Sequence, residues 1–105
     1  MQRRQYYRVQ YPPTDRPTIV FEDQVHPVLD IAETGIKYEH SGSALPQLGH
    51  HLTATVVFAD KERVEVEGLV LRITGSEVIV RLDRWVPFAK IMSEQRRFLK
   101  ASPAA

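Results

Sequence analysis

The stretch VEVEGLVLRI, residues 64–73, contains a change of phase in a pattern whose period is two residues. Its first two valines alternate with glutamates, as in a β-strand that buries one face. After Gly68 the apolar residues alternate again, but they are shifted by one position. Because glycine inside a strand is typical of a β-bulge or a sharp bend, the stretch predicts a strand that curls at Gly68.

Further stretches around this one show the same alternation, with β-branched and aromatic residues on one side: 18–22, 36–40, 52–58 and 78–82. Short turns at 60–62 and 74–76 indicate antiparallel neighbours, and a longer loop is expected at 41–49. This gives about six short strands. A small antiparallel sheet has to close or be covered to protect its edges, so we predict an all-β fold built on a six-stranded antiparallel barrel.

The C-terminal part changes to a helical period. Apolar residues in the stretch 87–100 recur at spacings of three and four, and Pro87 suits a first helical turn. We expect a helix over 86–100 that packs on the barrel, although a helix that binds a partner is the alternative. The full expectation is a single domain, 1–105, with a flexible arm at 1–15, the barrel at 16–85 and a tail at 101–105.

The composition excludes several classes of protein. The 105 residues carry a net charge of only +1 and include no cysteine, so neither a disulfide framework nor binding along a long polyanion is expected. The four histidines are scattered, and neither a metal-ligand pattern nor a nucleophile–base pair is visible. No apolar run reaches the length of a membrane span. We therefore expect a cytoplasmic, non-enzymatic protein with no metal and no cofactor.

The N-terminal stretch RRQYYR, residues 3–8, concentrates positive charge. It holds three of the fourteen Lys and Arg residues. Arg4 and Arg8 are four residues apart, which puts them on one side of either a helical turn or an extended segment. Two guanidinium groups on one side can hold a phosphate bidentately or pair with the edge of guanine. A solvated basic leader is the alternative interpretation.

The second chemical stretch is DIAETG, residues 30–35, which lies between two predicted strands. The Asp30 carboxylate can accept hydrogen bonds from guanine or pair with an arginine. Gly35 permits a positive φ and a close approach of the backbone at a tight turn. An ordinary strand connection is the alternative for this stretch.

Taken together, RQYYR at 4–8 and DIAETG at 30–35 resemble the two motifs of the PilZ domain, a bacterial receptor module for cyclic di-GMP. That family carries RxxxR in an N-terminal arm and (D/N)xSxxG at the end of a barrel strand. The resemblance covers nearly the whole chain. It implies a six-stranded antiparallel barrel with a C-terminal helix, which agrees with the fold expected from the periodicity.

The resemblance also implies roles for individual residues. Arg4 and Arg8 would grip the phosphates and guanine edges of cyclic di-GMP, and Asp30 would hold a guanine or orient an arginine. Gly35 would let the backbone approach the ligand. Arg3 precedes RxxxR, where a basic residue accompanies an intercalated ligand dimer. The candidates between Asp30 and Gly35 are Ala32, Glu33 and Thr34.

One position departs from the family pattern, because Ala32 stands where the family has serine. The loss of one neutral hydrogen bond costs about 0.5–1.5 kcal/mol, which is up to about tenfold in affinity. The leading expectation is a cyclic di-GMP receptor that signals to an unidentified protein partner through its arm. A PilZ-like adaptor with lost or weakened nucleotide binding is the alternative. A barrel that binds single-stranded nucleic acid lacks the required basic, aromatic face, so no DNA or RNA partner is expected.

Overall fold

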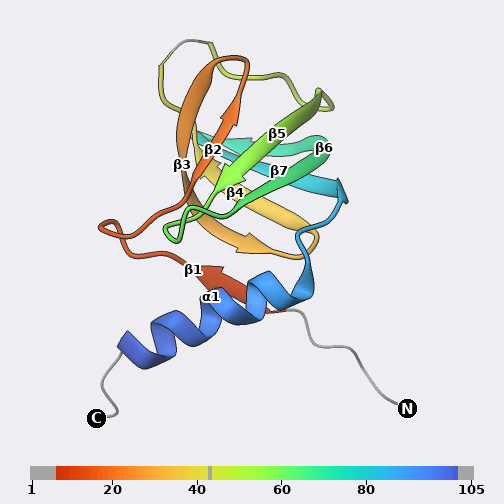
Figure 1. The fold of residues 1–105 in the computed structure, drawn as a ribbon. Coiled ribbons are helices and arrows are strands. Elements are labelled where there is room, and N and C mark those ends of the chain that lie inside the picture. The colour runs from red at the N-terminus through yellow and green to blue at the C-terminus, as the bar shows by residue number, and fades with distance from the viewer. Residues whose placement is uncertain (1–6, 43, 102–105) are drawn as a thin grey trace.

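The computed structural model describes residues 7–42 and 44–101, which form seven strands and one helix (Figure 1). In chain order these are β1 (Arg8–Gln10), β2 (Thr18–Phe21), β3 (Gln24–Ala32), β4 (Gly35–Glu39), β5 (His51–Val57), β6 (Arg63–Thr74), β7 (Glu77–Arg84) and α1 (Phe88–Ala101). The helix begins at Phe88, two residues after the expected start at 86, and ends at Ala101, one residue after the expected end at 100. Within the described residues, no helix has both the length and the apolar character needed to cross a lipid bilayer.

Strands β2 to β7 form a closed antiparallel barrel. The sheet order is β1-β3-β2-β5-β6-β7-β4, and an additional pairing of β3 with β4 closes it. The expected six-stranded barrel with a C-terminal helix is therefore confirmed. The remaining strand, β1, pairs with the last three residues of β3. It uses the same edge of β3 as β2, which pairs with the first four residues of that strand.

The long strand β6 curls, but its phase does not change at Gly68. Val66 and Val70 are both buried, so the even-numbered positions still face the core on either side of the glycine. The register shows that the extra residue on β6 is Leu71, which is skipped between Val70 and Arg72 and is 57% exposed. The β6–β7 ladder also shifts register between Glu67 and Gly68, so the irregularity expected at Gly68 is present, although the extra residue there lies on β7. Because Leu71 is apolar like the buried residues of the strand, the sequence pattern does not reveal that it is the extra, exposed residue.

Gly68 has a different role, which is to allow β7 to approach. A Cβ atom built on Gly68 would lie 2.2 Å from the carbonyl oxygen of Arg81. Opposite Gly68, β7 carries its own extra residue, since Glu67 pairs with Arg84 and Gly68 with Leu82. The two backbones can come this close only where one strand has no side chain.

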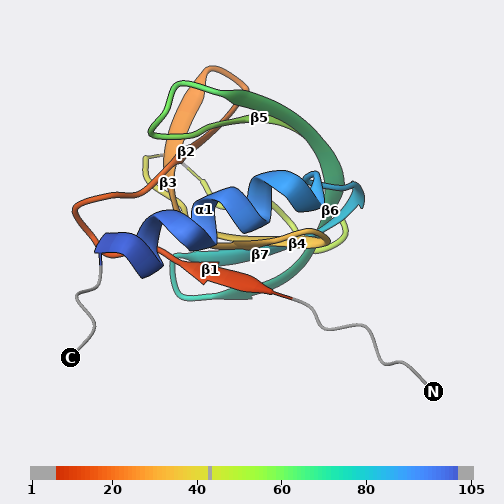
Figure 2. The same ribbon diagram turned by 60° about the horizontal axis from the view of Figure 1, so that its bottom comes forward.

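The helix α1 lies across one end of the barrel with β1 beside it, as Figures 1 and 2 show. Ile91 is fully buried in the core, and Glu94 is 2% exposed. Tyr11 follows β1 directly, and its hydroxyl donates a hydrogen bond of 2.7 Å to the carboxylate of Glu94. Lys90 reaches Asp60, in the turn between β5 and β6, at 2.6 Å. The helix is therefore tied both to the N-terminal segment and to the barrel.

The described part of the N-terminal segment, which was expected within a flexible arm over 1–15, packs against the barrel and α1. Val9 and Tyr11 are 3% and 5% exposed, and the amide of Tyr11 donates to the carbonyl of Leu29 at 3.0 Å. Asp15 forms an ion pair of 2.6 Å with Arg97 of α1. Tyr7, Val9 and Tyr11 pack inward and alternate with Arg8 and Gln10, which is the period-two pattern of a strand that buries one face.

Candidate functional site

A β-bulge in β3 decides which way the DIAETG residues point. Val28 pairs with Tyr38 of β4, whereas Asp30 pairs with Lys37, so Leu29 is the extra residue on β3. Val28 and Ile31 are both fully buried, which means that the inward face changes from even to odd positions across the bulge. Without the extra residue, strict alternation would turn Asp30 toward the core. Bulges are common beside functional sites because they redirect side chains in this way.

Strand β1 brings Arg8, the last residue of RxxxR, to the same outer face. Its register pairs Arg8 with Ala32 and Gln10 with Asp30, while Val9 between them is buried. Directly opposite residues of an antiparallel pair project from the same side of the sheet. The second arginine of RxxxR therefore lies across from the position at which Ala32 replaces the family serine.

Two cations stand near the Asp30 carboxylate. The Lys37 ammonium is 3.6 Å from Oδ2, and Nε of Arg8 is 4.0 Å from Oδ1. Asp30 is only 6% exposed, whereas the Arg8 side chain is 63% exposed. Lys37 also lies 3.7 Å from Glu77. Sequence reasoning missed Lys37, and only the β3–β4 register, which places it opposite Asp30, could have revealed it.

These residues surround a shallow pocket of about 120 Å³ on the outside of the barrel. Its lining combines the predicted motif residues with three from β4 and β7, and consists of Arg8, Asp30, Ala32, Thr34, Gly35, Ile36, Lys37 and Ile79. The pocket thus joins Arg8, the described end of RxxxR, to four residues of DIAETG. Its side chains offer two cations, one carboxylate and one hydroxyl around an apolar floor.

Gly35 lines this pocket without adopting the positive φ that glycine permits. The glycines with positive φ in the described residues are Gly42, Gly49 and Gly75, so the expected left-handed conformation at Gly35 is wrong. A Cβ atom at Gly35 would make only an ordinary 3.5 Å contact with the Val80 carbonyl. Since Gly35 pairs with Ala32, a side chain there would project over the pocket. The glycine keeps this surface open.

The turn between Ala32 and Gly35 is fixed against the end of β7. The carbonyl of Thr34 accepts from the Leu82 amide at 2.8 Å, and that of Glu33 accepts from the Val86 amide at 3.0 Å. Glu33 is buried and outside the pocket lining, whereas Thr34 borders the pocket. Trp85, beside Val86, is 47% exposed. The other two predicted arginines, Arg3 and Arg4, lie outside the described residues.

The histidines do not assemble a metal site in the described residues, where no three His, Cys, Asp or Glu side chains are grouped to hold a cation. His26 and His40 instead stack on each other with ring centroids 4.4 Å apart. His26 is fully buried, and its Nδ1 accepts a hydrogen bond of 3.1 Å from the Ser41 amide. This contact holds the start of the loop that joins β4 to β5.

The fold resembles two solved structures. The Bacillus subtilis inhibitor of motility MotI/DgrA aligns with a TM-score of 0.72 at 20% identity, over 97% of this chain and 54% of that one. YcgR from Escherichia coli, solved in complex with c-di-GMP, aligns with a TM-score of 0.56 at 17% identity, over 95% of this chain and 46% of that one. The chain thus spans about half the length of either protein. No curated protein sequence matches it.

The sequence profile of one domain family matches nearly the entire chain, over residues 2–101. The match includes both RxxxR and DIAETG, whose described parts meet at the pocket between β1, β3 and β4. The barrel, the C-terminal helix and this profile lead to one assignment: the chain belongs to the PilZ domain family.

Proposed function

We propose that this protein is a receptor for cyclic di-GMP and that the ligand binds over the pocket between β1, β3 and β4. The observation that carries the proposal is the register of β1, which pairs Arg8 of the first motif with Ala32 of the second. Membership of the PilZ family and the similarity to YcgR, a protein solved with c-di-GMP, support the choice of ligand.

The chemistry of the side chains matches the two parts of this ligand. The Arg8 guanidinium can hold a phosphate or the O6/N7 edge of a guanine, as arginine does in many nucleotide complexes. The Asp30 carboxylate can orient Arg8 or accept hydrogen bonds from a guanine, and Lys37 adds a second cation 3.6 Å from it. Arg3 and Arg4 would complete the cationic side, with Arg3 favouring an intercalated dimer of the ligand.

The signalling step would begin at β1. This strand contacts β3 on one side and α1 on another, and Tyr11 connects it to Glu94 of the helix. A ligand that binds Arg8 would stabilise one position of β1, so the position of the arm and the exposed surface of the helix can change together. A protein partner that recognises the altered surface would then carry the signal. We propose no catalytic role for the site.

Isothermal titration calorimetry with cyclic di-GMP tests the proposal directly. Binding should weaken at least about tenfold in Arg4→Ala and Arg8→Ala, because each loses a charge-assisted contact. Arg63→Ala removes an exposed arginine from β6 outside the pocket and serves as the matched control. Absence of heat at tens of micromolar protein, or binding by Arg8→Ala as tight as by Arg63→Ala, would contradict the proposal.

The alanine at position 32 supports a second candidate, a PilZ adaptor that no longer binds the nucleotide. Since Ala32 lies opposite Arg8, a hydroxyl at this position would point to the same face as the guanidinium. Under the leading proposal, Ala32→Ser should tighten binding by up to about tenfold. If neither the wild type nor Ala32→Ser binds, the adaptor is the better description. The titration also gives the stoichiometry, and one ligand per site would remove the role proposed for Arg3.

A further inference from the structure

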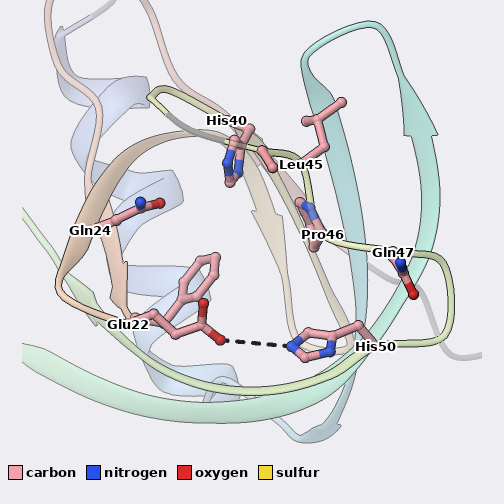
Figure 3. A pocket seen from close by; sticks show the side chains of 9 residues that line it. Glu22, Gln24, His40, Leu45, Pro46, Gln47 and His50 are labelled. Atoms are coloured by element: carbon pink, nitrogen blue, oxygen red, sulfur yellow. Dashed lines mark ion pairs between the residues drawn. The ribbon is translucent and has the colours of Figure 1, made fainter.

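A second pocket lies at the other end of β3 and β4, where the hairpin between β2 and β3 faces the loop between β4 and β5. Its volume is about 250 Å³, and Figure 3 shows it from close by. Phe21, Glu22 and Gln24 line it from the hairpin, and Leu45, Pro46 and Gln47 line it from the loop. We call it the hairpin slot. Pockets for drug-sized ligands are about 300–1,000 Å³, so this one suits a smaller group such as a single side chain.

The slot is held in shape by hydrogen bonds at both ends of the loop. At its start, the Ser41 hydroxyl donates to the Val25 carbonyl at 3.2 Å and the Ser41 amide donates to His26. At its end, the Gly49 amide donates to the Val70 carbonyl and the Val70 amide donates to the His50 carbonyl, at 2.8 and 2.9 Å. These bonds fix the two ends of the loop, which lowers the cost of ordering it on binding.

Glu22 occupies an unfavourable backbone conformation at the edge of the slot. The turn of the hairpin consists of Glu22 and Asp23, with φ angles of 51° and 61°. A two-residue turn with both φ angles positive favours Asn-Gly or Asp-Gly, and a side chain such as glutamate costs stability there. Strained residues of this kind concentrate at binding and catalytic sites. The turn directs the Glu22 carboxylate toward His50, across the slot, at 3.8 Å (Figure 3).

The electrostatic character of the slot is opposite to that of the first pocket. Among the described residues that line it, Glu22 supplies a carboxylate and His40 and His50 supply imidazole rings, and no lysine or arginine is included. The amides of Gln24 and Gln47 add carbonyl acceptors, and in Figure 3 their side chains lie on opposite sides of the slot. The ring of Phe21 adds an apolar surface. A carboxylate, amide carbonyls and an aromatic ring together suit a planar cation that donates several hydrogen bonds.

We propose that the hairpin slot binds the guanidinium group of an arginine that a protein partner presents. The apolar surroundings favour a protein over a free cation. Val25, Leu45 and Leu48 are 55%, 43% and 66% exposed and lie on the segments that form the slot. An arginine anchor surrounded by apolar contacts is a frequent arrangement at protein interfaces. The site would give the domain a contact with its partner at the barrel end opposite α1 (Figure 1).

Nuclear magnetic resonance of the ¹⁵N-labelled chain, without nucleotide, tests this proposal independently of the proposed cyclic di-GMP binding. The probes are N-acetyl-arginine methylamide and N-acetyl-lysine methylamide. The arginine probe should cause saturable shifts of the Gln24 and Gln47 side-chain amides with a Kd on the order of 1 mM. The lysine probe should bind at least about threefold more weakly, because ammonium lacks the planar donor fork.

Two neighbouring substitutions provide a matched comparison. Glu22→Gln removes the charge that lines the slot, whereas Asp23→Asn removes the same charge from the same turn but outside the lining. We expect Glu22→Gln to weaken binding of the arginine probe about fivefold and Asp23→Asn to change it less than about twofold. An arginine probe linked to leucine should bind more tightly than one linked to glycine.

Several results would overturn the proposal. One is that the resonance shifts caused by the arginine probe do not saturate by about 20 mM probe. The others are equal affinity for the lysine and arginine probes, and equal effects of Glu22→Gln and Asp23→Asn on binding of the arginine probe. Free L-arginine binding about tenfold more tightly than the blocked probe would identify a metabolite site instead of a protein contact.

Discussion

Replacing Tyr11 by phenylalanine tests how strongly the N-terminal segment is coupled to the C-terminal helix. The Tyr11 hydroxyl donates to Glu94 Oε1 at 2.7 Å, and Glu94 is 2% exposed. The Tyr11 ring also packs edge-on against Phe98, with centroids 5.3 Å apart. Tyr11→Phe keeps that packing and removes only the hydroxyl, so its effect isolates one buried, charge-assisted hydrogen bond.

The magnitude follows from what remains around the carboxylate. A hydrogen bond to a charged group contributes about 1.5–3 kcal/mol. In Tyr11→Phe, Arg97 still lies 3.4 Å from Oε1 and Lys90 3.8 Å from Oε2 of Glu94, so the charge keeps two partners. We therefore expect the lower half of that range, about 1.5–2 kcal/mol. Burial and the contact with Glu94 raise the pKa of Tyr11, so the hydroxyl stays protonated in ordinary buffers.

Urea denaturation followed by circular dichroism measures this loss. With a slope of about 1–3 kcal/mol per molar urea, the midpoint should fall by about 0.5–2 M at unchanged slope. Tyr38→Phe is the matched control, because Tyr38 is also buried but its hydroxyl makes only a 3.4 Å contact with His40. A loss below about 0.5 kcal/mol in Tyr11→Phe, or a larger loss in Tyr38→Phe, would refute the reasoning.

Two further predictions concern the barrel. Gly68→Ala should destabilise the fold by about 1–3 kcal/mol or more in the same urea assay, since its Cβ would meet the Arg81 carbonyl at 2.2 Å. Gly35→Ala should be nearly as stable as the wild type but should bind cyclic di-GMP more weakly. Equal losses of stability in Gly35→Ala and Gly68→Ala would contradict the roles given to the two glycines. Burial, aided by His40, lowers the pKa of His26 from 6.5. The neutral ring is favoured in the folded state, so this stabilisation is complete above pH 6.5 and is lost as the pH falls below it toward the lowered pKa. The urea midpoint should therefore be lower at about pH 5 than at pH 7. The difference should be smaller in His26→Gln, and an equal difference in both proteins would exclude His26 as the cause.

The barrel could be predicted from the sequence because most of its strands bury one face and alternate strictly. The extra residues Leu29 and Leu71 could not be predicted, since both are apolar residues placed where the chain leaves the regular pattern. The bulge at Leu29 matters most, because it turns Asp30 and Ala32 outward. Strict alternation from Val28 would have placed both in the core.

The candidate site was predicted where it depends on local motifs and missed where it depends on register. The motifs gave Arg8, Asp30 and Gly35, which do line one pocket. Lys37 was missed, because nothing in the sequence pairs it with Asp30 until β3 and β4 are aligned. The hydrogen bond between Tyr11 and Glu94 joins residues 83 positions apart, and no periodic pattern reports such a contact.

The pairing of β1 with β3 has a consequence for how two copies of the chain could meet. Three residues, Arg8 to Gln10, cover the peptide groups at the end of β3. Whenever β1 leaves, the edge from Asp30 to Ala32 becomes a template with unpaired donors and acceptors. The β1 of a second copy fits that template in the same register, so strand exchange between molecules would begin at this edge.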